Sequence, residues 1–183
     1  NTSLRGGAVS GFLVVALSLI GVSSIFAIYS NVLGHTIQET PFLIVGFGFG
    51  ASFATQSSVT DWYPALVKPS WNPPSWLFAP VWTVLYVMMA VAAWLVWKTG
   101  RNTSGAMILF FSQLALNFAW SFLFFGARSP WLGLIGVTFM LIAVAITTFV
   151  FWRITRPAGL LFAPYLAWTA FAAFLNLTIW RLN

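Results

Sequence analysis

The chain has no cysteine and very few charged residues. Of its 183 residues, 5% are Asp, Glu, Lys or Arg and 60% are hydrophobic, whereas soluble domains carry roughly 25% charged residues. The missing cysteines exclude disulfides and thiolate chemistry, but they do not identify a cellular compartment. A surface so poor in charge cannot face water, so we expect the lipid bilayer to be the solvent of this chain.

The few charged side chains also indicate where the chain crosses the bilayer. They separate long apolar runs, and a transmembrane helix needs about 20 such residues. Strands of membrane β-barrels alternate polar and apolar residues, whereas these runs are continuous, so we predict an all-α integral membrane protein. The predicted spans are 9–30, 41–58, 77–97, 105–126, 131–152 and 158–180.

The positive charge is spread along the chain. A net charge of +6 in a soluble protein would suggest nucleic-acid binding. Here the cations stand singly or in pairs at the ends of apolar runs, as Lys98 and Arg101 do, so we expect no nucleic-acid partner. Neither paired carboxylates nor a cluster of metal ligands stands out, which argues against conventional acid–base catalysis and against a metal site.

The stretch 61–82 interrupts the apolar runs with Pro64, Pro69, Pro73 and Pro74 and with four tryptophans. Proline removes a backbone donor and disfavours helix in the residue before it. We therefore predict a loop over 59–76, followed by a helix that has Pro80 in its first turn. Spacing alone leaves two interpretations open: an interfacial turn anchored by Trp and Tyr, or a loop that caps a ligand.

Three of the predicted spans carry aromatic and polar residues along one face. Amides in hydrocarbon must face a partner or a cavity, so the three faces could enclose one flat-walled apolar pocket. Alternatively, the amides link helices and the tryptophans fill a core; the residues alone leave both open. The faces consist of Phe78, Trp82 and Tyr86; Gln113, Asn117, Trp120 and Ser121; and Tyr165, Trp168, Thr169, Ala172 and Asn176.

The loop motif W-Y-x-x-L-x-K-P-x-W-x-P-P, from Trp62 to Pro74, closely resembles the signature loop of the TspO/translocator protein (TspO/MBR) family. Two further blocks agree with it, Q-L-A-L-N-F-A-W-S at 113–121 and P-Y-L-A-W-T-A-F-A-A-F-L-N at 164–176. The resemblance implies a bundle of five transmembrane helices over 41–183, usually a homodimer, that binds porphyrins, sterols and synthetic aromatic ligands. Residues 1–40 would then add an extra N-terminal transmembrane helix and its connection.

The resemblance also implies a ligand site. No cofactor is required, and the ligand would be a tetrapyrrole such as protoporphyrin IX. In some bacterial members, tryptophans that match Trp82 and Trp168 are linked to light-dependent porphyrin breakdown, which makes these two the candidate catalytic residues. The family's ligand positions fall on Tyr63, Pro73, Phe78, Trp82, Tyr86, Asn117, Trp120, Ser121, Trp168 and Ala172, and the capping loop adds Trp62, Pro69, Trp71, Asn72 and Pro74.

Three functions follow from these expectations. The leading hypothesis is a tetrapyrrole-binding membrane protein that acts as a sensor, scavenger or carrier. The second is a light-dependent porphyrin-degrading enzyme. The third is an accessory subunit that docks on a larger membrane complex through the helix at 9–30. A bacterial inner membrane and an organelle membrane, mitochondrial or plastid, fit equally well.

Overall fold

The computed structural model describes residues 58–100 and 103–183, and every regular element in these ranges is helical. The predicted spans 9–30 and 41–58 therefore lie outside the described residues, except for Ser58. Four helical stretches are long and apolar enough to cross a membrane: α4, α5 continued by η2, α6 and α7. The elements are η1 (Ser58–Trp62), α3 (Tyr63–Ala65), α4 (Ser75–Trp97), α5 (Ser104–Ser121), η2 (Phe122–Gly126), α6 (Pro130–Ile154) and α7 (Arg156–Leu182).

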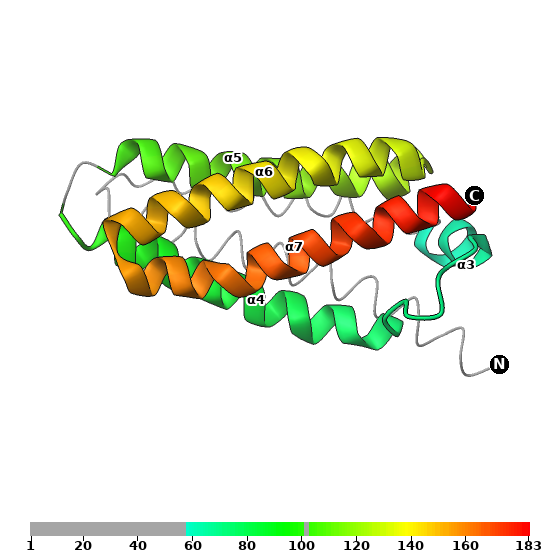
Figure 1. Cartoon of the computed structure of the whole chain (residues 1–183), viewed down its shortest axis with the longest axis horizontal. Helices are drawn as coiled ribbons and strands as arrows, with labels where there is room; N and C mark the ends of the chain where they lie inside the picture. The colour runs from blue at the N-terminus through cyan, green and yellow to red at the C-terminus, as the bar shows by residue number, and fades with distance from the viewer. Residues whose placement is uncertain (1–57, 101–102) are drawn as a thin grey trace, which may run out of the picture.

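The four long helices run lengthwise beside one another (Figure 1). Helix α7 packs against α4 and α6, and α5 packs against α6. The short helix α3 and the C-terminal end of α7 lie at the same end of the bundle, while the α4–α5 and α6–α7 connections lie at the opposite end (Figure 1). We call the end with α3 the loop end and the end with the two helix connections the basic end.

The start of α4 differs from the prediction. The helix begins at Ser75, two residues earlier than expected, and Pro80 lies inside it rather than in its first turn. Pro74 is the N-cap and has an extended backbone, with φ −63° and ψ 143°. A proline has no backbone N–H to donate to a helical hydrogen bond, whereas Ser75 and Trp76 can both adopt helical backbone angles. The helix therefore starts directly after Pro74. The predicted loop is correspondingly shorter, because 58–65 is helical and only 66–74 is extended or turn.

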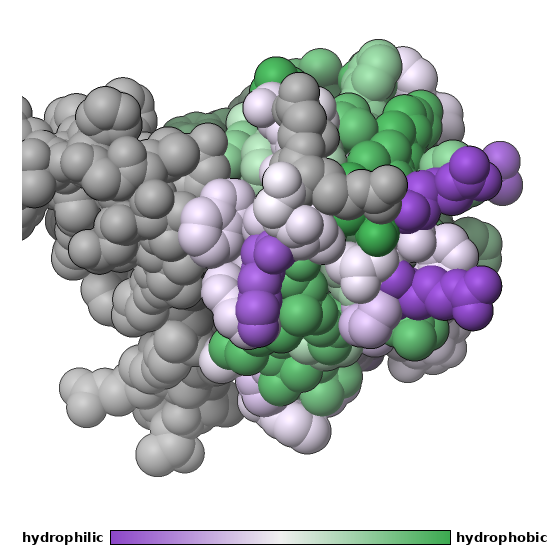
Figure 2. Space-filling view, turned by 90° about the vertical axis from the view of Figure 1, so that its left-hand side faces the viewer, coloured by the Kyte–Doolittle hydropathy of each residue, from purple (hydrophilic) through white to green (hydrophobic). Residues whose placement is uncertain are grey.

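The basic end carries Lys98, Arg153 and Arg156, all exposed. Figure 2 views the bundle from this end and shows hydrophilic side chains standing out from an apolar body. The Nζ atom of Lys98 lies 4.8 Å from the ring centroid of Trp94, and the guanidinium of Arg153 lies 6.0 Å from that of Phe149. Tryptophan and cations at a helix end are typical of the membrane–water boundary.

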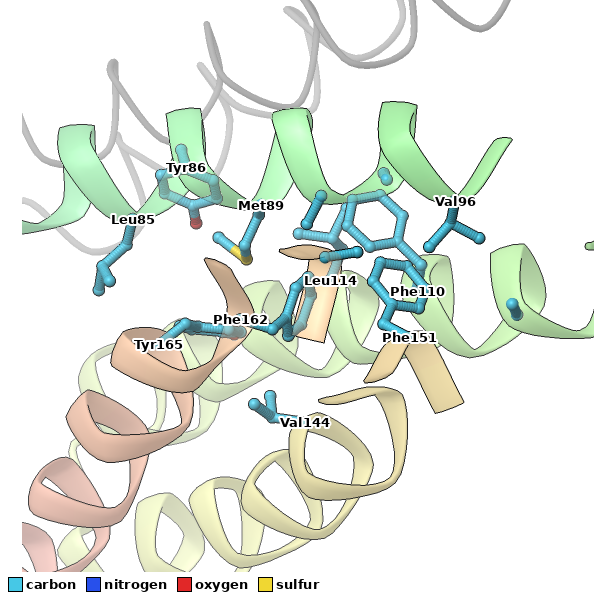
Figure 3. Packing of buried hydrophobic residues seen from close by; sticks show 14 of the residues in the cluster. Leu85, Tyr86, Met89, Val96, Phe110, Leu114, Val144, Phe151, Phe162 and Tyr165 are labelled. Atoms are coloured by element: carbon cyan, nitrogen blue, oxygen red, sulfur yellow. The ribbon is translucent and has the colours of Figure 1, made fainter. Parts of the chain in front are cut away.

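The apolar core lies between the four helices. Phe110, Phe151 and Phe162 are fully buried, and the ring centroids of Phe151 and Phe162 are 5.1 Å apart. Figure 3 shows these three rings together with Met89 and Val96. Toward the loop end this core meets Tyr86 and Tyr165, where the interior becomes polar.

Candidate ligand-binding site

A buried chain of hydrogen bonds joins α4, α5 and α7. The hydroxyl of Tyr86 donates to Oδ1 of Asn117 at 3.4 Å, and Nδ2 of Asn117 donates to the hydroxyl of Tyr165 at 2.9 Å. That hydroxyl in turn donates to Oε1 of Gln113 at 3.0 Å. All four residues are buried. We call them the polar cluster.

One donor of the polar cluster is unused. Gln113 is 0% exposed, and its Nε2 is the one buried side-chain atom without a hydrogen-bond partner in the part of the chain that the structure describes. Leaving a buried donor unpaired costs about 1–3 kcal/mol. The polar cluster therefore has the capacity to donate to one further acceptor.

Aromatic rings flank the polar cluster on the α4 side. The ring of Trp82 stacks on that of Tyr86 with centroids 5.5 Å apart, and it meets the ring of Tyr165 edge-on at 6.1 Å. Trp82 is only partly buried, unlike its two phenol neighbours. Indole therefore forms the accessible side of this group.

A second row of rings leads from α4 across α7 to the loop. Phe78 meets Trp168 at a centroid distance of 5.9 Å, and Trp168 meets Phe171 at 5.6 Å. Trp71, in the loop, lies 5.9 Å from Phe171 and stacks on Phe174 at 5.3 Å with the ring planes 16° apart. We call these five rings the aromatic row.

A third group lies where η1 and α3 meet α5 and η2. The ring of Tyr63 contacts both Phe124 at 6.1 Å and Phe125 at 5.7 Å. Phe124 and Phe125 are consecutive residues, and consecutive side chains of an α-helix point about 100° apart. Here both residues lie in the π-helical turn η2, which is wider than an α-helical turn. Nε1 of Trp120 donates to Oδ1 of Asn176 at 3.3 Å, and Nδ2 of Asn176 donates to the carbonyl of Pro130 at 2.8 Å.

Polar side chains tie the loop to the short helix α3. The hydroxyl of Tyr63 donates to Oδ1 of Asn72 at 3.3 Å. Nζ of Lys68 donates to the carbonyls of Tyr63, Pro64 and Leu66 at 2.7, 3.1 and 2.9 Å. Burial raises the pKa of Tyr63 above its ordinary value of 10.0, and the hydrogen bond with Asn72 offsets part of that rise.

Comparison with known proteins decides the family. The model described as "TspO/MBR family" matches residues 40–181, which is most of the chain. The chain belongs to the TspO/MBR family. It is 44% identical over 144 residues to "Tryptophan-rich protein TspO" of Chlorobaculum tepidum, covering 77% of this chain and 91% of that protein. It is also 44% identical over 126 residues to the human "Translocator protein", covering 67% and 75%.

A third relative is the "Tryptophan-rich sensory protein" of Cereibacter sphaeroides, 40% identical over 123 residues that cover 67% of this chain and 77% of the relative. With its four apolar helices, this TspO/MBR chain is an integral membrane protein. The family match begins at residue 40, so the predicted span 9–30 precedes it. Within the described ranges, no three His, Cys, Asp or Glu side chains gather in a way that could hold a metal ion.

The structure distributes the ligand positions that the TspO/MBR resemblance marked over three groups of contacts. Among the described residues, no side-chain hydrogen bond or ring contact joins Pro73, Ser121 or Ala172 to the other ligand positions. Tyr86 and Asn117 share the polar cluster, Phe78 and Trp168 share a ring contact, and Trp120 reaches Asn176. Asn117 and Asn176 link helices, as one of the two alternatives expected, through their hydrogen bonds to α7, α5 and α6. Trp82, Trp120 and Trp168 are half-buried and pack against the apolar core, so their burial alone leaves both the pocket and the core-filling alternatives open. Trp62, Pro69, Asn72, Pro73, Ser121 and Ala172 are also half-buried, whereas Trp71 and Pro74 are exposed.

Sequence reasoning missed the phenylalanines that connect these residues. Phe171 and Phe174 join the loop to Trp168, and Phe124 stacks on Trp120 at 5.5 Å. Spacing holds a signal for some of them, since Phe171 follows Trp168 by three positions and Phe124 follows Trp120 by four. Nothing in the spacing indicates that Trp71 reaches α7.

Proposed function

We propose that this TspO/MBR chain binds a planar tetrapyrrole, such as protoporphyrin IX, between α4, α5 and α7 at the loop end, and acts as a sensor, scavenger or carrier. One observation carries the proposal. The half-buried indole of Trp82 packs on Tyr86 and Tyr165, which belong to a buried cluster of amides and phenols. The half-buried indole of Trp168 meets Phe78, which precedes Trp82 by one turn of α4. Flat aromatic surfaces with a few convergent polar groups are typical of sites for flat hydrophobic ligands.

The charges in the sequence suggest how such a ligand would lie. The spans of α4 to α7 contain no Asp, Glu or Lys, and their arginines stand near the helix ends. The macrocycle would pack on the indoles, and Nε2 of Gln113 would donate to an uncharged acceptor. Carboxylate groups of a tetrapyrrole would point to the loop end and to water, since a buried charge without a counter-ion is costly.

Fluorescence quenching by protoporphyrin IX tests the proposal. Saturable quenching is expected for the wild type, and Trp82→Ala and Trp168→Ala should each weaken binding by about tenfold, since a lost aromatic contact in a desolvated site costs 1 kcal/mol or more. Trp94→Ala is the matched control. Trp94 lies on the same helix as Trp82 and is 42% exposed at the basic end, so its removal should leave the affinity unchanged. Non-saturable quenching, or an equal loss in the Trp94 variant, would overturn the proposal.

Light-dependent porphyrin degradation is the second candidate. It is favoured by the position of Trp82, which stacks on Tyr86 and meets Tyr165. An indole oxidised by an excited porphyrin would therefore have two phenols beside it as electron donors. A new porphyrin product band under light, absent in Trp82→Phe/Trp168→Phe, would support this activity. An equal bleaching rate in the double variant would remove it.

For the rest of the chain we propose that 41–58 completes a five-helix TspO-type bundle, that 9–30 is an additional span and that the protein forms a homodimer. The family match from residue 40 to 181 supports the first part. The additional span would either anchor the chain or dock it on a larger membrane complex. Native electrophoresis of a chain without residues 1–34 tests docking, because an unchanged assembly would leave only the anchor.

A further inference from the structure

The last side chain of the sequence binds the backbone of the loop. Oδ1 of Asn183 accepts from the N–H of Val67 at 3.0 Å, and Nδ2 of Asn183 donates to the carbonyl of Val67 at 3.0 Å. Nδ2 also donates to the carbonyl of Ile179, one turn back in α7, at 2.9 Å. The side-chain amide thus pairs with both polar groups of Val67, in the way that two residues of an antiparallel sheet exchange both hydrogen bonds.

This pairing is one of two points at which the loop 66–74 is fastened to α7. The other is the stacking of Trp71 on Phe174 and its edge contact with Phe171. The second point leads on to the site, because Phe171 also meets Trp168 in the aromatic row. Loop position and the site tryptophan are therefore connected through packed rings.

The fastening lies at the surface of the protein. Val67 is 56% exposed and Trp71 is 42% exposed, and the Asn183 side chain is exposed as well. Hydrogen bonds that water can replace contribute little net stability. Such a contact can open and close without unfolding the helices, which is the behaviour of a latch rather than of a permanent brace.

We propose that Asn183 is a positioning residue that latches the loop 66–74 onto α7, and that ligand enters and leaves the site when this latch is released. The second half rests on the proposed function, whereas the first does not. Asn183 touches no ligand in this scheme. It acts by setting the fraction of time that the loop is open, and so it changes association and dissociation rates together.

Two variants and one control test the latch on the full chain. Asn183→Ala removes all three hydrogen bonds. Asn183→Asp keeps an oxygen facing the N–H of Val67 but replaces the donor to the Val67 and Ile179 carbonyls with an acceptor. Leu182→Ala is the control, because it truncates the neighbouring exposed side chain and leaves the amide in place. The first readout is hydrogen exchange at the amide of Val67, which needs no ligand.

We expect Val67 to exchange about 2- to 10-fold faster in Asn183→Ala, the range set by one or two exposed hydrogen bonds. Asn183→Asp should exchange faster than the wild type, and Leu182→Ala should match the wild type. An unchanged rate in Asn183→Ala, or an equal increase in Leu182→Ala, overturns the latch.

The second readout is the rate of protoporphyrin IX binding and release by stopped-flow quenching. In Asn183→Ala both rates should rise by a similar factor of about 2 to 10, and the equilibrium affinity should change less than either rate. Faster exchange at Val67 with unchanged rates of binding and release would overturn the role in ligand passage. A wild type that does not bind the porphyrin at all would instead contradict the proposed function, and the exchange result would still decide the latch.

Discussion

The two ends of the bundle interior differ although the same helices supply both. Toward the basic end of α5, α6 and α7, Phe110, Phe151 and Phe162 are fully buried and meet ring to ring. Toward the loop end, α5 contributes amides and α7 contributes Tyr165 and a half-buried Trp168. The first region has the composition of a core built for stability, and the second has the composition of a site.

Tyr165 lies at the border between these regions. Its ring contacts Phe162 at 5.8 Å on one side and Trp82 at 6.1 Å on the other. Its hydroxyl holds the polar cluster together. The comparison therefore predicts that substitutions on the Phe162 side change stability and that those on the Trp82 side change binding.

The largest effect should come from the apolar core. Phe162→Ala removes a fully buried ring and should lower the free energy of unfolding by about 3–5 kcal/mol, because the lost packing leaves a cavity. Thermal unfolding in detergent measures this loss of stability. At temperatures where the variant remains folded, its porphyrin affinity should stay close to that of the wild type. A variant as stable as the wild type but unable to bind porphyrin would reverse the two assignments.

Tyr165→Phe should have the next largest effect. It keeps the ring contacts but leaves Nδ2 of Asn117 and Oε1 of Gln113 without the hydroxyl between them. Unpaired buried groups cost about 1–3 kcal/mol each, so the melting temperature should fall and the porphyrin affinity should fall with it. Unchanged values for both quantities would show that the polar cluster contributes neither stability nor binding.

Gly133→Ala probes the contact of α6 with Phe124 of η2 and Asn176 of α7. A Cβ atom at this position would approach the ring of Phe124 and lie 2.9 Å from Oδ1 of Asn176, so we expect a loss of about 1–3 kcal/mol from overpacking. Gly105→Ala is the matched control, because a Cβ atom there meets nothing within 4 Å. An exposed helical Gly→Ala change should be neutral or stabilising, by up to about 1 kcal/mol. Equal melting temperatures for the two variants would contradict the close approach.

The smallest effect should be a pH dependence that arises at Tyr63, in the short helix α3 beside the loop. Burial raises the pKa of Tyr63 above 10.0, so the neutral phenol is favoured in the folded state. Its contribution to stability is fully present below pH 10 and is lost as the pH rises through the raised pKa. Thermal unfolding measured across this alkaline range should fall more steeply for the wild type than for Tyr63→Phe. Parallel curves for the two proteins would contradict a raised pKa of Tyr63 in the folded state.

The sequence was sufficient to predict the helices but not the contacts between the site groups. The spans 77–97, 105–126, 131–152 and 158–180 coincide with α4, α5 continued by η2, α6 and α7 within two residues at every end, because charge and hydropathy limit where a chain can leave the bilayer. The predicted start of α4, at residue 77, was two residues late, because Pro80 was expected in the first turn of the helix. In the structure Pro74 is the N-cap and the helix begins at Ser75.

The partners of the loop depend on tertiary packing. Periodicity placed Tyr86 and Asn117 on inward faces, and the structure joins them. It could not indicate that Trp71 stacks on Phe174 or that Asn183 pairs with Val67, because neither contact follows from helical spacing. The π-helical turn at Phe122–Gly126, which accompanies the contact of Phe124 and Phe125 with Tyr63, also has no clear sequence signal.

Hydrogen exchange with and without protoporphyrin IX tests the central claim most directly, because it reports on both ends of the bundle in one experiment. We predict that the porphyrin slows exchange in segments 63–82 and 165–176 and leaves the basic-end connections, 97–104 and 152–157, unchanged. Slower exchange at the basic end with an unaltered loop end would contradict the claim that the ligand binds beside Trp82 and Trp168.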